Sequence, residues 1–127
     1  MNYLLDTHTI IWYLEDLFKI SSKAKEIIKL PDNNIHICSV SLWEIAIKMN
    51  LDKLKLGLML DELLTAIKNS DINILQIENE YLKRLSSLPY IHKDPFDRLI
   101  IVTALVENLT IITADENIQK YDVSWIW

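Results

Sequence analysis

The sequence predicts an α/β fold in which a central, mainly parallel sheet of five strands is flanked by helices. Short apolar runs alternate along the chain with segments of helical periodicity, a pattern that favours parallel strands joined by helical crossovers. The runs lie at residues 2–6, 35–39, 72–76, 110–113 and 123–127. The first and fourth runs are continuously apolar, as central strands are, whereas the third and fifth alternate more, as edge strands do. We therefore expect the first and fourth strands to be neighbours at the centre.

Composition and charge narrow the class of protein. The 127 residues are 50% hydrophobic, which is enough for one domain with a proper core. Thirteen Lys and Arg against 18 Asp and Glu give a formal net charge of −5, so contact with nucleic acid would have to be local or mediated by a metal ion. Cys38 is the only cysteine, which excludes an internal disulfide and a thiolate zinc cluster. No signal peptide or membrane-spanning segment is recognisable, and we expect a cytoplasmic protein without membrane contact.

The first half of the chain predicts three helices. One follows the first strand after a tight turn at residues 7–9, and another covers the sheet over residues 21–30 behind a serine N-cap. The third follows the second strand, where the spacing of Ser41 and Glu44 fits a capping box with Ser41 as N-cap. Lys48 lies four residues after Glu44, which is the favourable order for an ion pair on a helix.

The second half predicts two further helices and one segment of unusual composition. Residues 54–67 carry eight Leu, Ile and Met side chains, too many for one stripe on a helix packed against a sheet, so we expect some of them to face a partner. A helix with an apolar face covers residues 81–88. The last helix begins after Asp94, an N-cap followed by Pro95 at the first helical position, and ends at Asn108 as a left-handed C-cap.

Four acids are expected at one edge of the sheet. Asp6 ends the first strand, Glu44 lies in the first turn after the second, and Asp97 and Asp115 stand before and after the fourth. In a parallel sheet this edge forms the crevice where α/β proteins bind ligands. Each acid alone is explained by helix capping, but two carboxylates about 4 Å apart repel by roughly 4 kcal/mol, and a divalent cation removes that cost. Oxygen ligands without cysteine or a histidine pair select Mg²⁺ or Mn²⁺, which act on phosphate esters.

The chain carries four motifs in a specific order and spacing. They are Leu5-Asp6-Thr7-His8, the segment 39–48, the segment 92–99 and Thr113-Ala114-Asp115. Together they resemble the PIN-domain endoribonucleases of the VapC-like type, which are toxins of bacterial type II toxin-antitoxin pairs. The resemblance covers nearly the whole chain and implies one PIN-like domain over residues 1–127. It also implies a Mg²⁺- or Mn²⁺-dependent enzyme that hydrolyses RNA, forms a homodimer and is inhibited by a cognate antitoxin protein.

The resemblance assigns roles to individual residues, and the sequence adds further candidates. The predicted catalytic and metal-binding residues are Asp6, Glu44, Asp97 and Asp115. The residues expected to support this site are Thr113, Thr7 and Asp94, the last as a neighbouring acid or simply as an N-cap. The candidate substrate contacts are Arg98, Lys48 and His92. The candidates for docking the antitoxin are Leu56, Leu58, Met59, Leu60 and Leu63.

Some features depart from the family pattern or leave an alternative. Relatives with these motifs commonly have Gly-Lys where this chain has Asp52-Lys53, a departure that concerns the local loop and not the site. A receiver domain would have a second acid directly after Asp6, and a haloacid-type phosphatase one two residues after it, so both fit poorly. An inactive PIN-like module that only binds a partner remains an alternative. Trp12 and Trp43 are expected in the core rather than as platforms for nucleobases.

Overall fold

Strands and helices follow one another in the predicted alternation. The computed structural model describes every residue from Met1 to Trp127. Its elements are β1 (Asn2–Leu5), α1 (Thr7–Glu15), the 3-10 helix η1 (Leu17–Lys19), α2 (Ser22–Lys29), β2 (Asn34–Cys38), α3 (Ser39–Asn50), α4 (Leu60–Lys68), β3 (Asn73–Leu75), α5 (Asn79–Leu85), α6 (Pro95–Glu107), β4 (Thr110–Ile112), α7 (Glu116–Gln119) and β5 (Trp125–Ile126). None of these helices combines the length and the apolar character needed to cross a membrane. The short η1 and α7 were not expected from the sequence, and α4 lies in the apolar segment for which no helix was predicted.

The five strands form one sheet in the order β3-β2-β1-β4-β5, and every neighbouring pair is parallel. β1 and β4 lie side by side at the centre, with Leu5 opposite Ile112, so the predicted arrangement is confirmed. The chain moves outward from β1 to β3 on one side and from β4 to β5 on the other. Because the direction of winding reverses between β1 and β4, the crevice at the carboxyl ends of these strands is the expected ligand site.

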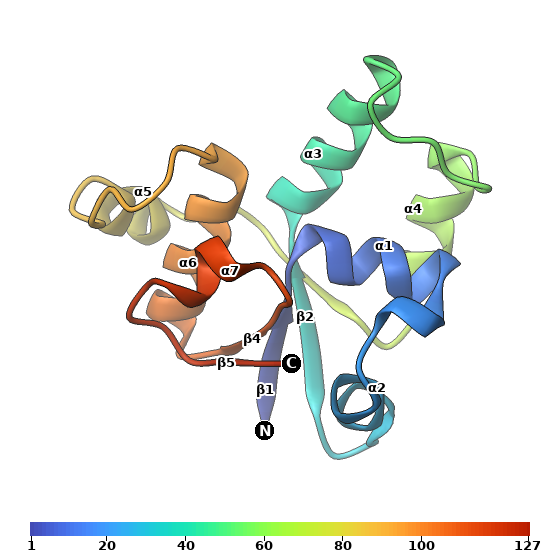
Figure 1. The fold of residues 1–127 in the computed structure, drawn as a ribbon, viewed down its shortest axis with the longest axis horizontal. Coiled ribbons are helices and arrows are strands. Elements are labelled where there is room, and N and C mark those ends of the chain that lie inside the picture. Colours follow the sequence, from blue (N-terminus) through green and yellow to red (C-terminus); the bar gives the residue numbers. More distant parts are fainter.

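The two faces of the sheet enter two separate cores. On β1, Leu5 points into the core that includes residues of α1, α2 and α4, whereas Leu4 points into the core formed with α5, α6 and α7. Figure 1 shows the first four helices on one side of the sheet and the last three on the other. Burying one such leucine contributes about 1.5–3 kcal/mol. With both faces covered, the carboxyl edge of the sheet is where polar side chains can gather.

Helix caps fix the turns beside this edge. Asp6 caps α1, Asp94 caps α6 and Asp115 caps α7, each by accepting a hydrogen bond from a backbone amide in the first turn. Pro95 is the first residue of α6, and Asn108 ends that helix with a φ of 55°, as predicted. Three of the acidic side chains are therefore held in place by the backbone itself.

Helix α3 begins earlier than predicted. It starts at Ser39, directly after the last residue of β2, and Cys38 at the N-cap makes no side-chain capping bond. Ser41 lies inside the helix and is buried, so the predicted capping box is wrong. The physical reason is that the strand passes into the helix without an intervening turn. Glu44 is consequently one turn further into the helix, and its side chain does not bond the helix end.

The apolar segment 54–67 is only partly helical. Residues 51–59 form turns and coil, and α4 covers the remainder. Asp52 has a φ of 53°, the left-handed region that glycine adopts most easily, which accounts for the glycine expected at this position from the resemblance. The chain accepts an aspartate there because Asp and Asn tolerate this conformation better than other residues do.

The predicted docking leucines mostly belong to the core. Leu63 is fully buried, so its expected role in docking is wrong, because α4 turns this side chain toward the sheet. Three others, Leu56, Leu58 and Leu60, are half-buried against the same core. Met59 is 69% exposed and is the one member of the group that remains open to a partner.

Candidate active site

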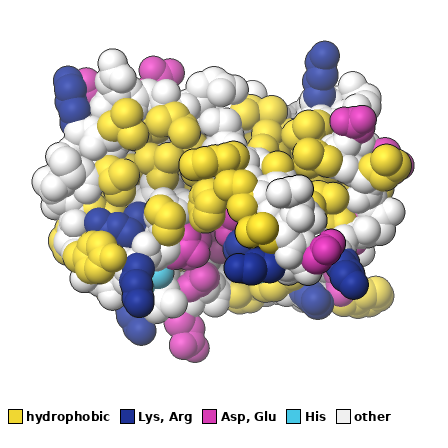
Figure 2. Space-filling view, turned by 90° about the horizontal axis from the view of Figure 1, so that it is seen from above, with side chains coloured by type: hydrophobic (Ala, Val, Ile, Leu, Met, Phe, Trp, Pro, Cys, Tyr) yellow, Lys and Arg dark blue, Asp and Glu magenta, His cyan; other side chains and the backbone are white.

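The four predicted acids lie at the carboxyl edge of the sheet. Asp6 directly follows β1, and Asp115 follows β4 at the N-cap of α7. Glu44 comes from α3, and Asp97 comes from the first turn of α6. Figure 2, seen onto this edge, shows acidic side chains near the middle of the face, with Lys and Arg side chains on both sides. The fold thus gathers acids that are far apart in the sequence.

Asp6 and Asp115 are linked through the buried hydroxyl of Thr113. Thr113 Oγ1 donates a hydrogen bond to Asp6 Oδ2 and accepts one from the Asp115 amide at 3.0 Å. The other Asp6 oxygen, Oδ1, accepts a hydrogen bond from the Thr9 amide at 2.9 Å. Burial raises the pKa of Asp6, and these hydrogen bonds oppose the rise. Thr113 therefore orients the carboxylate at the point where β1 and β4 meet.

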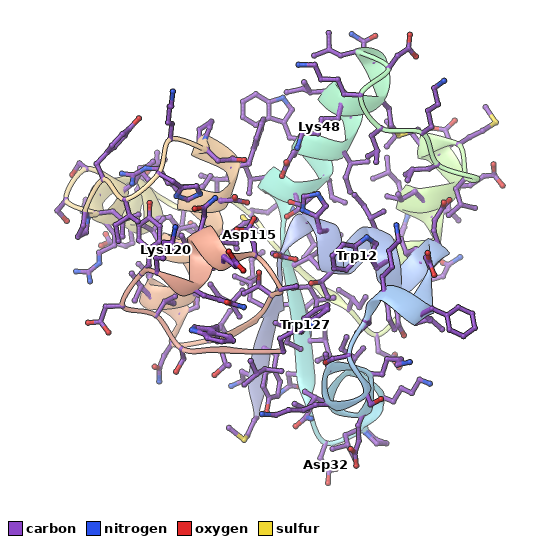
Figure 3. The ribbon with its side chains drawn as sticks, in the orientation of Figure 1. Trp12, Asp32, Lys48, Asp115, Lys120 and Trp127 are labelled. Carbon is purple, nitrogen blue, oxygen red and sulfur yellow. The ribbon has the colours of Figure 1, made fainter.

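Glu44 is almost fully buried and is held from two sides. Thr7 Oγ1 donates a hydrogen bond to Glu44 Oε1 at 2.6 Å, and it also lies 3.0 Å from Ser41 Oγ. Lys48 Nζ forms the predicted ion pair with Glu44 Oε2. Partial burial lowers the pKa of Lys48, but the hydrogen bond and charge of Glu44, with smaller contributions from nearby acids, raise it overall. Lys48, which Figure 3 labels on α3, is thus the cation that faces the acids.

Asp97 lies in surroundings that disfavour its charged form. Its side chain is 13% exposed. Burial is the largest cause that raises the pKa of Asp97 to about 8. The neighbouring carboxylates of Asp94, Asp115, Glu44 and Asp6 raise it further. The other three predicted acids are therefore close enough to act on Asp97, and the site without a metal ion favours a proton on this side chain.

His92 and Tyr121 form a hydrogen-bonded chain that ends at Asp97. Tyr121 Oη lies 2.8 Å from His92 Nδ1, and His92 Nε2 lies 3.3 Å from Asp97 Oδ2. Tyr121 Oη already accepts hydrogen bonds from Arg98 Nη1 and from the His92 amide, so its one proton is directed to His92 Nδ1. That arrangement assigns the proton of the neutral imidazole to Nε2, which donates to Asp97.

Arg98 differs from its predicted role. It was a candidate contact for the substrate phosphate, but its guanidinium is buried and donates to the carbonyls of Pro89 and Leu88 and to Tyr121 Oη. All of these contacts lie away from the acids. Arg98 therefore fixes the loop before α6 and, through Tyr121, the orientation of His92. No pattern in the sequence indicated Tyr121, because it lies after α7, 29 residues beyond His92.

The donor set fits a hard divalent cation, although the side chains are not closed around one. No three of the His, Cys, Asp and Glu side chains converge tightly enough to enclose an ion in the present arrangement. Carboxylate oxygens dominate the site; of the two nearby imidazoles, that of His92 is directed to Asp97 and that of His8 is exposed. This composition matches Mg²⁺ or Mn²⁺ and not zinc. The carboxylates gathered around Asp97 add to the effect of burial in raising its pKa, and a divalent cation would offset their repulsion.

Comparison with known proteins places the chain in a family. The sequence matches the family model of the PIN domain over residues 3–124. The chain belongs to the PIN-domain family. The predicted resemblance is confirmed at this level, and PIN domains as a family are nucleases that generally use divalent metal ions. No curated protein matches the sequence.

Solved structures share the fold of this PIN domain. VapBC2 from Rickettsia felis, bound to a DNA fragment from its promoter, aligns with a TM-score of 0.75 at 18% identity, covering 99% of this chain and 98% of that one. VapBC-1 from nontypeable Haemophilus influenzae aligns with a TM-score of 0.65 at 23% identity, covering 99% and 97%. A toxin-antitoxin complex from Klebsiella pneumoniae aligns with a TM-score of 0.62 at 22% identity, covering 98% and 96%.

Proposed function

We propose that this PIN domain is a Mg²⁺- or Mn²⁺-dependent endoribonuclease that hydrolyses phosphodiester bonds of RNA. The observation that carries the proposal is the meeting of Asp6, Glu44, Asp97 and Asp115 at the reversal point of the sheet. Burial raises the pKa of Asp97, and repulsion from the neighbouring carboxylates adds to this, so that the pKa lies at about 8. Such an arrangement is costly in a purely structural protein, and a bound divalent cation compensates it.

Each side chain has a distinct task in the proposed reaction. Asp6, Asp97 and Asp115 would hold the cation, joined by Glu44 once its carboxylate separates from Lys48. When bound, the ion supplies charge neutralisation at the phosphate and activation of water. Thr113 keeps Asp6 Oδ2 oriented, and the His92 Nε2 proton does the same for Asp97 Oδ2.

Lys48 contributes a charge that the acids lack. Its side chain is 34% exposed beside Glu44, so the ammonium can also reach a substrate phosphate at the rim of the site. In the absence of an ion it partly neutralises the cluster. In its presence the same ammonium is available to the negatively charged backbone of the RNA, which the net charge of −5 would otherwise repel.

We further propose that the protein is the toxin of a type II toxin-antitoxin pair, acts in the cytoplasm and forms a homodimer. Support for the antitoxin comes from the similarity in fold to the Klebsiella pneumoniae toxin-antitoxin complex over almost the whole chain. Exposed apolar side chains support contacts with other chains. Met59 lies before α4, and Leu82, Tyr90 and Ile91 lie in or after α5.

An RNA cleavage assay tests the proposed activity. An end-labelled, single-stranded RNA pool of mixed sequence is incubated with the protein and Mg²⁺, Mn²⁺ or EDTA, with single-stranded DNA of matched sequence beside it. We expect cleavage of RNA only with metal. Glu44→Gln should reduce it by at least about tenfold, as loss of residues at a metal site does.

Glu62→Gln is the matched control, because Glu62 is also a helical glutamate but lies exposed in the first turn of α4. It should retain full activity. Cleavage that survives in EDTA, or in Glu44→Gln, would contradict the metal-dependent mechanism. Binding of a partner without any cleavage would favour the interaction module instead, and equal cleavage of DNA would refute the preference for RNA.

A further inference from the structure

A small cavity opens directly beside the acidic site. It has a volume of about 180 Å³ and is lined by Asp6, His8, Trp12, Ala114 and Asp115. Two of its walls are therefore acids of the candidate active site, and the other two large side chains are aromatic rings from α1. Figure 3 labels Asp115, which precedes α7, and Trp12 of α1. A ligand in this cavity would lie next to the reacting phosphate.

The aromatic wall is only partly used by the fold. Trp12 is half-buried against the core and makes an edge contact with Trp127, with ring centroids 5.8 Å apart at 62°. His8 is exposed, and its ring lies 5.8 Å from that of Trp12 at a tilt of 41°. Trp127 thus holds the indole in place, while the exposed imidazole at the rim is free to adjust. One fixed ring and one adjustable ring can receive a flat molecule.

The charges of the cavity decide which part of a nucleotide can enter it. A phosphate is repelled by the carboxylates of Asp6 and Asp115, and the acidic cluster offers it a place only through a cation. A neutral nucleobase meets no such repulsion, and its faces can stack on the aromatic rings of the cavity. The chemistry therefore favours a base over a phosphate here.

We propose that this cavity is a nucleobase subsite, in which a base next to the scissile phosphate of single-stranded RNA stacks on Trp12 with His8 at the rim. The inference rests on the proposed ribonuclease function and adds a determinant of substrate choice to it. Unpaired substrate is required, because a base inside a duplex is already stacked and cannot enter a side cavity. Trp12 is a binding residue in this account, and it takes no part in bond cleavage.

Equilibrium binding separates this role from a structural one. Two labelled probes of equal length are compared with Ca²⁺ in place of Mg²⁺: a mixed-sequence single-stranded RNA and an abasic ribose-phosphate oligomer. We expect the wild type to bind the RNA more tightly than the abasic oligomer. In Trp12→Leu, which keeps an apolar side chain but lacks a ring, this difference should fall by about tenfold, and Trp12→Phe should restore part of it.

Two further variants keep the test decisive. Trp125→Leu is the matched control, because Trp125 is an exposed tryptophan on β5 outside the cavity, and its RNA preference should equal that of the wild type. His8→Ala removes an exposed side chain without touching the core and should reduce the preference by a smaller factor. It also provides a second test if Trp12→Leu folds poorly in thermal unfolding.

Each outcome bears on the subsite separately from the proposed activity. A wild type that binds both probes equally, or an RNA preference that is unchanged in Trp12→Leu and His8→Ala, would overturn the nucleobase subsite. If the wild type shows the preference but never cleaves RNA with Mg²⁺ or Mn²⁺, the proposed activity fails while the subsite stands. If the wild type cleaves RNA but binds both probes equally, the proposed activity stands and the subsite fails.

Discussion

Replacing Asp97 with asparagine should stabilise the metal-free protein at neutral pH. Asp97 is 13% exposed, and burial together with four neighbouring carboxylates raises its pKa to about 8. Asparagine resembles the protonated acid in shape and keeps an oxygen that can accept the hydrogen bond from His92. The variant therefore removes the charge while it preserves the packing at the start of α6.

The size and pH dependence of this effect follow from the two pKa values. In the unfolded chain Asp97 has its ordinary pKa of 3.8, so the folded protein binds a proton more tightly between that value and about 8. Stability consequently decreases as the pH rises through this window. One pKa unit corresponds to about 1.36 kcal/mol, which sets an upper bound of about 4 kcal/mol at pH 7. Solvent access to the side chain reduces it, and we expect about 2 kcal/mol.

Urea unfolding in EDTA measures this difference. The free energy of unfolding of Asp97→Asn should match that of the wild type at pH 4 and exceed it increasingly toward pH 8. Asp61→Asn is the control, because Asp61 is an exposed acid in the first turn of α4. It should show no such gain. A constant difference across the pH range, or a destabilised Asp97→Asn at pH 8, would refute the electrostatic account of the site.

Three other substitutions test individual contacts. Thr113→Val deletes the hydroxyl that donates to Asp6 and accepts from the Asp115 amide, and should lower the free energy of unfolding by about 1.5–3 kcal/mol in urea denaturation at pH 7. Tyr121→Phe removes the group that fixes the His92 tautomer, and should lower both stability, by about 1–3 kcal/mol, and the rate of RNA cleavage; an unchanged rate would separate His92 from the reaction. Asp52→Gly removes the strain of a side chain at a φ of 53°. It should raise the free energy of unfolding by up to about 1 kcal/mol, which is measured as a higher midpoint of thermal unfolding.

The sequence was most informative where local chemistry determines the structure. The N-cap at Asp94, Pro95 after it and the left-handed C-cap at Asn108 are consecutive signals, and α6 begins and ends as they predict. Strand order could be predicted because continuous apolar runs require cover on both faces, which the central positions of β1 and β4 provide. The placement of the acids at one edge then follows from parallel strands.

The predictions for Ser41 and Arg98 differ from the structure because their contacts involve residues far away in the sequence. Ser41 fitted a capping box, but the helix starts two residues earlier, and this serine instead lies beside Thr7. Arg98 was predicted to contact a substrate phosphate, but its guanidinium donates hydrogen bonds to carbonyls of the preceding loop and to Tyr121. Long-range partners of this kind depend on how loops pack, which the spacing of residues along the chain does not determine.

The burial of Trp43 and Trp12 was also not predictable from the sequence. Trp43 was expected in the core but is 59% exposed and makes an edge contact with Phe96. Trp12 is only half-buried, since one side of its ring faces the cavity beside Asp6. A hydrophobic residue on a helix next to an active site can serve the core and a ligand at once, and the sequence alone does not separate these uses.

The most direct test of the central claim is thermal unfolding with EDTA and then with millimolar Mn²⁺ or Mg²⁺, for the wild type, Asp97→Asn and Asp61→Asn. An ion that binds only the folded state stabilises it by about 2.7 kcal/mol at a hundredfold excess over its Kd, which moves the midpoint by several degrees. We predict this shift for the wild type and Asp61→Asn and its loss in Asp97→Asn. No shift in any of them, or an equal shift in all three, would contradict a cation site formed by the four acids.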